Sequence, residues 1–445
     1  MFVVTLPASA AKRPQEFAKK AKTAGAQLLE IRGDLTPDVS VFDSPLPLIV
    51  SPRGTGSTLI KTLKPSFIDL ELNEIVEVPA GVTVIRSFHD REKTPDLTEL
   101  QKIANDLLAT KPDIIKIATM IRSYDDLRTL DALHQQIPSS QMRVILGMGP
   151  KAHLNRMLSP LKNALTYTFM DDGDESAPGQ VPISLHKLTA HCKKPKIFGL
   201  IGSPVAHSAS PLIHNTLLQR HDIDGLYTLF PVERDLLSSF EDLIALGIAG
   251  YSVTSPWKRQ ILEFVEHGGL TSCNTVIRKN DRLIGYNTDE IGFRLAYPFL
   301  KDCSDIAILG SGGVVPSVID ACRGLTPAKI TVFARNDVEL QKIGNLYSVD
   351  TMELENIVDA DSDAIVSALS VPVPLTLPRK KGAHAIDLRY GGVSTFLGEA
   401  HEKGYQIYTG LRMLIEQAFE QFRLFTGTTP DDTDRKAVLA LFPSV

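Results

Sequence analysis

Short apolar segments with β-strand character recur along the first 192 residues, and amphipathic helical stretches separate several of them. The helical stretches include residues 96–110 and 123–137, whose apolar positions follow helical spacing. Eight strands that alternate with helices predict a (β/α)8 barrel over residues 1–192. Residues 73–81 are too few for a full crossover helix, so we expect the barrel to be trimmed at that connection. The eight segments are residues 2–6, 27–32, 46–51, 66–72, 82–88, 113–119, 142–147 and 164–169.

Polar residues fall at the late ends of these segments. Glu30 and Arg32 close the second segment, Glu71 closes the fourth, and His89 directly follows the fifth. In a barrel these ends converge where active sites are built. Lys116 lies inside the sixth segment, where desolvation would favour the neutral amine that a Schiff base requires. Two other interpretations stay open: a buried ion pair of Lys116 with Glu71 or Glu30, and a purely structural His89.

Five motifs in this order make the first 192 residues similar to the type I 3-dehydroquinate dehydratases: LLEIRGDL, SFIDLEL, VIRSFHDREKTP, PDIIKIATM and SAPGQ. The resemblance implies that Lys116 forms an imine with the ring ketone of 3-dehydroquinate. It implies that His89 removes a proton from the adjacent carbon and helps the hydroxyl leave as water, with Glu71 orienting His89. The substrate-binding residues implied are Glu30, Arg32, Arg156 as the main carboxylate clamp, and Ser176 and Gln180 from a lid-like loop.

Residues 196–445 predict two further α/β lobes joined to the barrel by a short linker, Lys193 to Pro195. The first lobe opens with a strand, a turn rich in serine and proline, and a helix. Ser210 is a candidate N-cap ahead of Pro211, and the same helix N-terminus could also attract a carboxylate. Because each half has its own apolar segments, we expect each to fold as a unit.

The second lobe contains a glycine-rich turn between a predicted strand and a predicted helix. Gly310, Ser311, Gly312 and Gly313 form this turn, which is the context of a dinucleotide fingerprint. The next strand ends at Arg335 rather than at an acidic residue, which favours NADP over NAD, although Arg335 could also be a plain surface charge. We expect Val315 and Pro316, which replace smaller residues, to crowd the phosphate turn.

Seven segments make this half similar to the shikimate dehydrogenases: GSPVAHSASPLIHN, VTSPWK, SCNTVI, GYNTDEIGF, GSGG, DLRYGGVSTFL and GLRMLIEQAF. The resemblance implies that Lys258 and Asp289 form the catalytic pair beside the reacting oxygen, where they supply a proton as the ketone is reduced. The substrate-binding residues implied are Ser208, Ser210, Thr254, Asn274, Tyr390 and Gln417. Ser252 departs from the family pattern, which usually has Asn there.

These resemblances imply boundaries for the second half. We expect a shikimate-binding lobe over 196–298, a Rossmann-type NADP lobe over 299–395, and a C-terminal helical segment over 396–445. Leu414, Ala418 and Phe422 form an apolar stripe on the last helix, so we expect it to pack back on the substrate lobe and to bring Gln417 to the cleft.

The two resemblances name consecutive reactions. Together they predict a bifunctional enzyme of aromatic amino-acid biosynthesis, in the pathway to chorismate, that converts 3-dehydroquinate through 3-dehydroshikimate to shikimate. One alternative is a quinate/shikimate dehydrogenase that works catabolically with NAD. Another is a regulatory pseudoenzyme that senses pathway metabolites, but such a protein would be expected to lose catalytic groups, and all five predicted ones are present.

Composition narrows the remaining possibilities. Hydrophobic residues make up 43% and charged residues 22%, which is ordinary for a globular protein, and the net charge of −5 argues against nucleic-acid binding. No apolar run reaches the ~18 residues that a membrane span needs, and the N-terminus is not typical of a signal or transit peptide, so we expect a cytoplasmic protein. The four cysteines suggest no disulfide framework, the histidines form no metal motif, and the sequence leaves the oligomeric state open.

Overall fold

The computed structural model describes all residues except 56, 174, 391–393 and 443–445. The chain divides into two compact units, which are treated separately below. The first unit comprises Met1–Gly199, Pro204–Pro211 and His221–Ile248, and the second comprises Leu200–Ser203, Leu212–Arg220 and Ala249–Val445. The predicted boundary after residue 192 is therefore not where the compact units divide. Among the described helices, none is both long and apolar enough to cross a bilayer.

The first unit contains the curled parallel sheet of a (β/α)8 barrel, as predicted. Its strand order is β7-β6-β5-β4-β3-β2-β1-β8-β9, and a backbone hydrogen bond from Ala164 N to Arg143 O (2.9 Å) links the segment before β8 to β7. The strands are β1 (Phe2–Thr5), β2 (Leu28–Arg32), β3 (Leu48–Ser51), β4 (Phe67–Glu71), β5 (Thr83–Asp90), β6 (Ile114–Met120), β7 (Met142–Met148), β8 (Thr166–Phe169) and β9 (Val181–Pro182).

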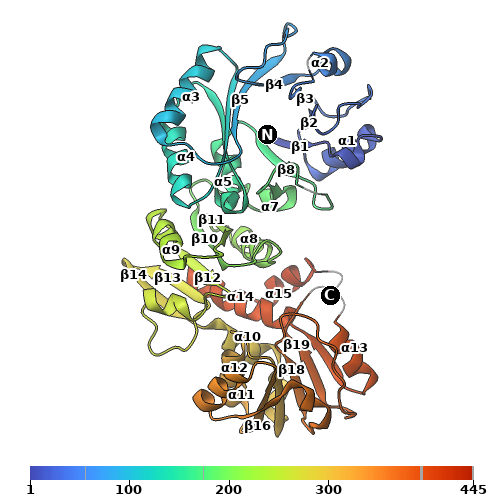
Figure 1. Ribbon diagram of the computed structural model, residues 1–445, viewed down its shortest axis with the longest axis vertical. Helices are drawn as coiled ribbons and strands as arrows, with labels where there is room; N and C mark the ends of the chain where they lie inside the picture. The colour runs from blue at the N-terminus through green and yellow to red at the C-terminus, as the bar shows by residue number, and fades with distance from the viewer. Residues whose placement is uncertain (56, 174, 391–393, 443–445) are drawn as a thin grey trace. The chain divides into compact units, whose positions relative to one another are not determined.

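Helices cover the outside of this sheet (Figure 1). The described connection from β4 to β5 contains no helix, so the trimmed barrel is confirmed at that place. The helices are α1 (Pro14–Ala24), α2 (Thr58–Leu63), α3 (Leu97–Ala109), α4 (Asp125–Gln136), α5 (His153–Met157), α6 (Ser159–Lys162) and α7 (Ile183–Leu188).

Alternation along each strand gives the barrel two apolar layers. Val3 and Leu28 belong to a buried cluster that includes Val144 and Leu165, whereas their neighbours Val4 and Leu29 belong to a second cluster with residues of α1 and α2. Because successive side chains of a strand point to opposite faces, one cluster fills the interior and the other lies beneath the helices.

The first unit also contains β10 (Lys196–Gly202) up to Gly199, β11 (Gly225–Pro231) and α9 (Leu236–Ala245). Tyr124 at the start of α4 donates its hydroxyl to Pro231 O (2.9 Å), and its ring meets Phe230 edge-on. The predicted linker is held by Asp224, whose carboxylate accepts the backbone N–H groups of Lys193 and Lys194 at 3.0 and 2.9 Å.

The second unit contains an antiparallel meander and a six-stranded parallel sheet. The meander is formed by β12 (Gly250–Val253), β13 (Thr275–Lys279) and β14 (Arg282–Tyr286). The parallel sheet has the order β17-β16-β15-β18-β19-β20, formed by β15 (Asp305–Leu309), β16 (Lys329–Ala334), β17 (Asp350–Glu353), β18 (Ala364–Ser367), β19 (His384–Asp387) and β20 (Gln406–Thr409). Because β20 pairs with β19, this sheet extends past the predicted lobe boundary at residue 395, which was placed too early.

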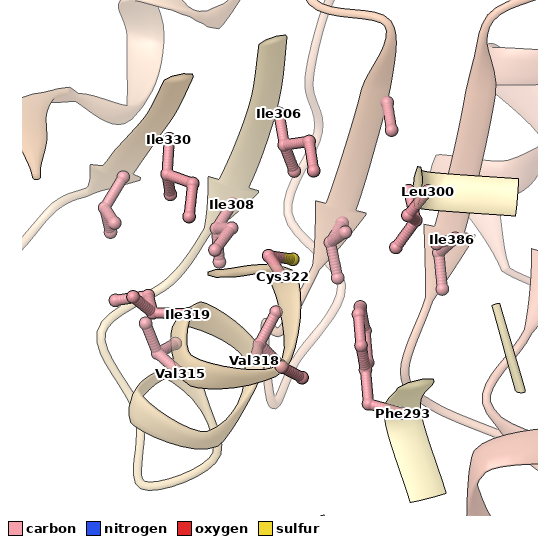
Figure 2. Close-up of a cluster of buried hydrophobic side chains, with 14 of the residues drawn as sticks. Phe293, Leu300, Ile306, Ile308, Val315, Val318, Ile319, Cys322, Ile330 and Ile386 are labelled. Carbon is pink, nitrogen blue, oxygen red and sulfur yellow. The ribbon is translucent and has the colours of Figure 1, made fainter. Parts of the chain in front are cut away.

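Helices lie on both faces of the six-stranded sheet (Figure 1). On β15, Ile306 and Ile308 face a core formed with α11 (Val315–Leu325) and α12 (Asp337–Tyr347), and Figure 2 shows Val315, Val318 and Ile319 of α11 beneath them. Ala307 and Leu309 face the opposite core with α13 (Thr395–Glu402). This arrangement is the doubly wound fold that the sequence predicts.

The last helices of the chain are α14 (Leu411–Thr426) and α15 (Asp432–Leu439). As predicted, Ala418 and Phe422 are buried, and α14 packs closely on α10 (Thr288–Ala296). The approach is so close that a Cβ atom at Gly292 would lie 2.6 Å from Gln417 Cβ, so only glycine fits there. Earlier in the chain, helix α8 (Ser210–Arg220) follows β10.

Candidate active sites

A cavity of about 320 Å³ lies at the carboxyl ends of the barrel strands. It gathers most of the residues predicted for the barrel site onto one surface. The cavity lining contains residues that the sequence predicted and others that the sequence did not predict. The lining includes Glu30, Arg32, Arg53, His89, Arg91, Lys116, Arg156, Tyr167, Ser176 and Gln180.

Lys116 is buried on β6 and is held from two sides. Its Nζ donates to Asp69 Oδ2 at 2.8 Å and lies 4.0 Å from the centroid of the Tyr167 ring. The alternative interpretation, an ion pair of Lys116 with Glu71 or Glu30, is wrong in its partner, because Asp69 on β4 holds the ammonium instead. A carboxylate and an aromatic face both attract a positive charge on this nitrogen.

His89 at the end of β5 lies beside Glu71, as predicted. Nδ1 of His89 and Oε1 of Glu71 are 2.8 Å apart. Burial, together with the charges of Lys116 and Arg53, lowers the pKa of His89, and the Glu71 contact opposes this shift only in part. A neutral imidazole in this position can accept a proton.

Arg53 is a central residue of the site that the sequence analysis missed. It follows β3, and it forms ion pairs with Asp69 (2.9 Å) and Glu71 (2.7 Å). Burial opposes ionisation of Asp69, but Arg53 and Lys116 hold the pKa of that carboxyl well below its usual range. The sequence did contain a signal for Asp69 as a member of this site, because Asp69 lies two residues before Glu71 and therefore on the same face of the strand.

Arg156 is buried on α5, where its Nε donates to Gly147 O at 2.6 Å. Burial lowers its pKa to about 10, and the charge of Glu175 opposes this shift only in part. A buried guanidinium that faces a cavity is suited to bind an anion such as a carboxylate.

The remaining predicted barrel residues are already bonded to the protein. Glu30 accepts hydrogen bonds from Thr5 (2.6 Å) and Ser51 (2.8 Å), and Arg32 pairs with Asp34 and donates to Ser176 O. In the loop before β9, Gln180 Oε1 accepts from the backbone N and the Oγ of Ser176. These bonds hold the loop across one side of the cavity.

The second unit brings together Lys258, Asp289 and Asn274. Lys258, in the turn after β12, donates Nζ to Asp289 Oδ2 at 2.5 Å, and Asn274 Nδ2 donates to Asp289 Oδ1 at 2.8 Å. Asn274 Oδ1 accepts the backbone N–H of Thr288 (2.8 Å), which fixes its amide orientation. The carboxylate is therefore held by an ammonium on one oxygen and an amide on the other.

Of the other residues predicted to bind the dehydrogenase substrate, three lie in the second unit and two lie in the first. Thr254 follows β12, Tyr390 is half-buried beside the undescribed residues 391–393 of the DLRYGGVSTFL segment, and Gln417 is buried and donates to Leu414 O. Ser208 and Ser210 lie in the first unit. There α8 begins at Ser210 itself, and Ser208 Oγ accepts its N–H, so the N-cap expected at Ser210 is wrong.

A buried glutamine that the sequence analysis did not single out supports Asn274. Gln421 on α14 donates to Asn274 O (3.2 Å) and to Thr275 Oγ1 (3.1 Å), and its Oε1 accepts the Ser252 hydroxyl (2.9 Å). The small side chain at position 252 therefore has a polar partner from the last helix.

The glycine-rich turn lies between β15 and α11. Gly310 has φ 115°, which disfavours other residues, and a Cβ at Gly312 or Gly313 would meet nothing within 4 Å. Val315 is buried in the core under the sheet (Figure 2), so the expected crowding of the phosphate turn is wrong for this residue. Pro316 is buried as well. Arg335 is exposed directly after β16.

All four cysteines are free and buried. No group of three or more histidine, cysteine or acidic side chains among the described residues is arranged to hold a metal ion.

Family profiles match both parts of the chain. The type I 3-dehydroquinase profile matches residues 56–189, the shikimate dehydrogenase substrate-binding domain matches 200–272, and the shikimate 5′-dehydrogenase C-terminal domain matches 410–439.

Relatives and solved structures agree. A shikimate dehydrogenase (NADP(+)) of Pyrococcus furiosus is 34% identical over 262 residues, covering 55% of this chain and 96% of the relative. The bifunctional 3-dehydroquinate dehydratase/shikimate dehydrogenase of Arabidopsis thaliana, named as chloroplastic, is 26% identical over 92% of this chain and 79% of its own length. The structure of shikimate 5-dehydrogenase from Thermus thermophilus in complex with NADP(H) and shikimate has a TM-score of 0.50 and 28% identity, covering 55% of this chain and 98% of that one. The chain belongs to the shikimate dehydrogenase family, here joined to a type I 3-dehydroquinase domain.

Proposed function

We propose that this chain catalyses two consecutive reactions of the shikimate pathway, dehydration of 3-dehydroquinate and reduction of the resulting 3-dehydroshikimate to shikimate. The observation that carries the proposal is the barrel cavity, where Lys116, His89 and Arg156 face the same space. A primary amine, a base and an anion site are what an imine-based dehydration of a ketone carboxylate requires.

In the barrel, Lys116 is the imine-forming residue. Arg156 binds the substrate carboxylate, and Glu30, Arg32, Ser176 and Gln180 hold ring hydroxyls and close the cavity. His89, kept neutral by burial, takes the proton from the carbon next to the imine and returns it to the departing hydroxyl. Glu71 holds the ring of His89 in position, and Arg53 holds Glu71.

In the second unit, Lys258 donates the proton that the ketone oxygen needs as the substrate is reduced. Asp289 stabilises the ammonium and directs it, while Asn274 keeps the carboxylate in place. Thr254, Tyr390 and Gln417 bind the substrate carboxylate and hydroxyls, and the roles implied for Ser208 and Ser210 stay predictions. Removal of Lys258 therefore affects the transfer of the proton more than the binding of the substrate.

The glycine-rich turn fits a dinucleotide phosphate. The open space at Gly312 and Gly313 admits a pyrophosphate close to the backbone, and Arg335 pairs with a 2′-phosphate. NADPH, when bound, supplies the hydride. Use of NAD in a catabolic direction is disfavoured by Arg335.

A labelling experiment tests the barrel assignment. Borohydride added with 3-dehydroquinate should attach a stable mass to the peptide that contains Lys116, and Lys116→Ala should abolish this labelling while shikimate dehydrogenase activity stays near normal. Labelling of undiminished extent in Lys116→Ala would overturn the assignment. A cytoplasmic location stays a prediction.

A further inference from the structure

The ring of Tyr167 covers the nitrogen of Lys116 inside the barrel. We propose that Tyr167 is a positioning residue for the dehydratase reaction: its ring face holds the positive charge on the Lys116 nitrogen, first as the ammonium and then as the iminium formed with the substrate. The inference rests on the proposed imine chemistry and extends it to a residue that none of the motifs contains.

The geometry places a cation on an aromatic face in a desolvated site. Nζ of Lys116 lies 4.0 Å from the ring centroid, well within the ~6 Å range of cation–π attraction. Tyr167 is 4% exposed and Lys116 is 5% exposed, so water screens this attraction little. Asp69 Oδ2 holds the same nitrogen at 2.8 Å, so a carboxylate and a ring fix the charge together.

The overall step that forms the imine conserves this charge. An ammonium and a ketone give an iminium and water; two N–H hydrogens leave with the carbonyl oxygen, two bonds form between nitrogen and carbon, and the nitrogen carries one positive charge before and after. The ammonium has three N–H groups to donate to Asp69 and to water, whereas the iminium keeps one, so the covalent intermediate depends more on the ring face than the starting ammonium does. The iminium keeps one N–H, which Asp69 can accept.

The hydroxyl of Tyr167 makes no interaction comparable to that of the ring with the Lys116 nitrogen. It is buried, and none of the described residues provides a hydrogen-bond partner for it. Burial raises the pKa of Tyr167 well above its ordinary value, so the phenol stays un-ionised and acts on Lys116 through its ring. Two substitutions at position 167 therefore separate the role of the ring from that of the hydroxyl. Phenylalanine keeps the aromatic ring face and loses the hydroxyl, whereas methionine keeps much of the side-chain volume and loses the ring face.

The test measures the fraction of protein trapped as the reduced imine, by intact mass, after borohydride is added at a 3-dehydroquinate concentration below wild-type half-saturation. Tyr167→Phe should trap as much as wild type, and its melting temperature should not fall. Tyr167→Met should lower the ratio of trapped to free protein about tenfold, with a matching rise in the dehydratase KM. Equal trapping by Tyr167→Met and wild type would overturn the inference.

Tyr124 offers a matched control in the same unit. Lys151 Nζ lies 5.3 Å from the Tyr124 ring, outside the residues that line the cavity. Tyr124→Met removes a buried tyrosine and a cation–π contact of the same kind, so it should cost stability but leave the trapped fraction unchanged. A similar loss of trapping in Tyr124→Met would show a general effect of destabilisation and contradict the inference.

If Tyr167→Met does not fold, phenylalanine with one, two or three ring fluorines at position 167 withdraws charge from the face at nearly constant size. The trapped fraction should fall stepwise with each fluorine, and a flat series would contradict the inference. A wild-type protein that shows no adduct on Lys116 would instead contradict the proposed dehydratase chemistry itself, so the two failures are distinguishable.

Discussion

Asp69 is fully buried, and one of its oxygens holds two cations, Arg53 at 2.9 Å and Lys116 at 2.8 Å. Asp69→Asn would remove the carboxylate that pairs with Lys116 and would leave Arg53 with Glu71 as its carboxylate partner among the described residues. We therefore expect the barrel to lose about 3–5 kcal/mol of unfolding free energy, together with most dehydratase activity.

Urea unfolding measures this loss. Asp131→Asn is the matched control, because Asp131 pairs with Lys162 where both side chains are partly exposed, and such pairs contribute about 0–1 kcal/mol. If the two variants lose equal stability, Asp69 is not the anchor described here.

Arg335 determines the cofactor preference in this account. A charge-assisted pair with the 2′-phosphate contributes about 1.5–3 kcal/mol, or roughly one to two orders of magnitude in affinity. Arg335→Ala should raise the KM for NADPH by that factor and leave the KM for NADH nearly unchanged. A wild-type protein that uses both cofactors equally would make Arg335 a plain surface charge.

At the scale of single residues, the sequence predicted which residues belong to the site better than it predicted which residues they contact. Lys116, His89 and Glu71 were all placed at one site, since strand ends in a barrel converge. Asp69 as the partner of Lys116 was not predicted, because the choice among several inward carboxylates depends on strand register and side-chain reach. Gln421 was missed for a related reason, since only the packing of α14 brings it to Asn274.

At the scale of elements, α7 carries a buried histidine with an unusual environment. His186 stacks on Phe2 of β1, and neither ring nitrogen has a hydrogen-bond partner among the described residues. Burial lowers its pKa to about 3, so His186 is neutral when folded and takes up a proton near pH 6.5 when unfolded. Its contribution to stability is therefore complete above about pH 6.5 and declines as the pH falls toward 3.

His186→Phe should remove this dependence. The unfolding free energy of the barrel should depend less steeply on pH in this range, by roughly 1.4 kcal/mol per pH unit. At pH 7 the unfolding free energy should not decrease. Denaturant unfolding at several pH values measures the slope, with the exposed His207→Phe as control. An unchanged slope in His186→Phe would show that another group dominates the acid limb.

The pattern of apolar segments predicted all eight barrel strands, because buried parallel strands are continuous apolar runs. It did not predict β9, which has only two residues, or β20, whose exposed side chains give no apolar signal. Both are defined by pairing with a neighbouring strand, to β8 and β19 respectively. Short edge strands of this kind depend on tertiary contacts that periodicity does not contain.

At the scale of the whole molecule, the catalytic groups of each reaction lie within one compact unit: Lys116 and His89 in the first, Lys258 and Asp289 in the second. We therefore expect the two reactions to proceed independently, with the intermediate passing through solvent. A mixture of Lys116→Ala and Lys258→Ala chains should make shikimate from 3-dehydroquinate after a lag, at a steady rate close to that of wild type. A mixture that stays nearly inactive, while each variant keeps its own half-reaction, would show obligatory transfer within one chain.

The most direct measurement is incubation of the purified chain with 3-dehydroquinate, with and without NADPH, with both products followed over time. Without the cofactor, 3-dehydroshikimate should accumulate and no shikimate should form. With NADPH, shikimate should appear in equal amount to the oxidised cofactor, and Lys116→Ala should abolish both products while still reducing added 3-dehydroshikimate. Failure of the wild-type chain to form 3-dehydroshikimate, or its formation without later reduction, would contradict the account of one chain with two working sites.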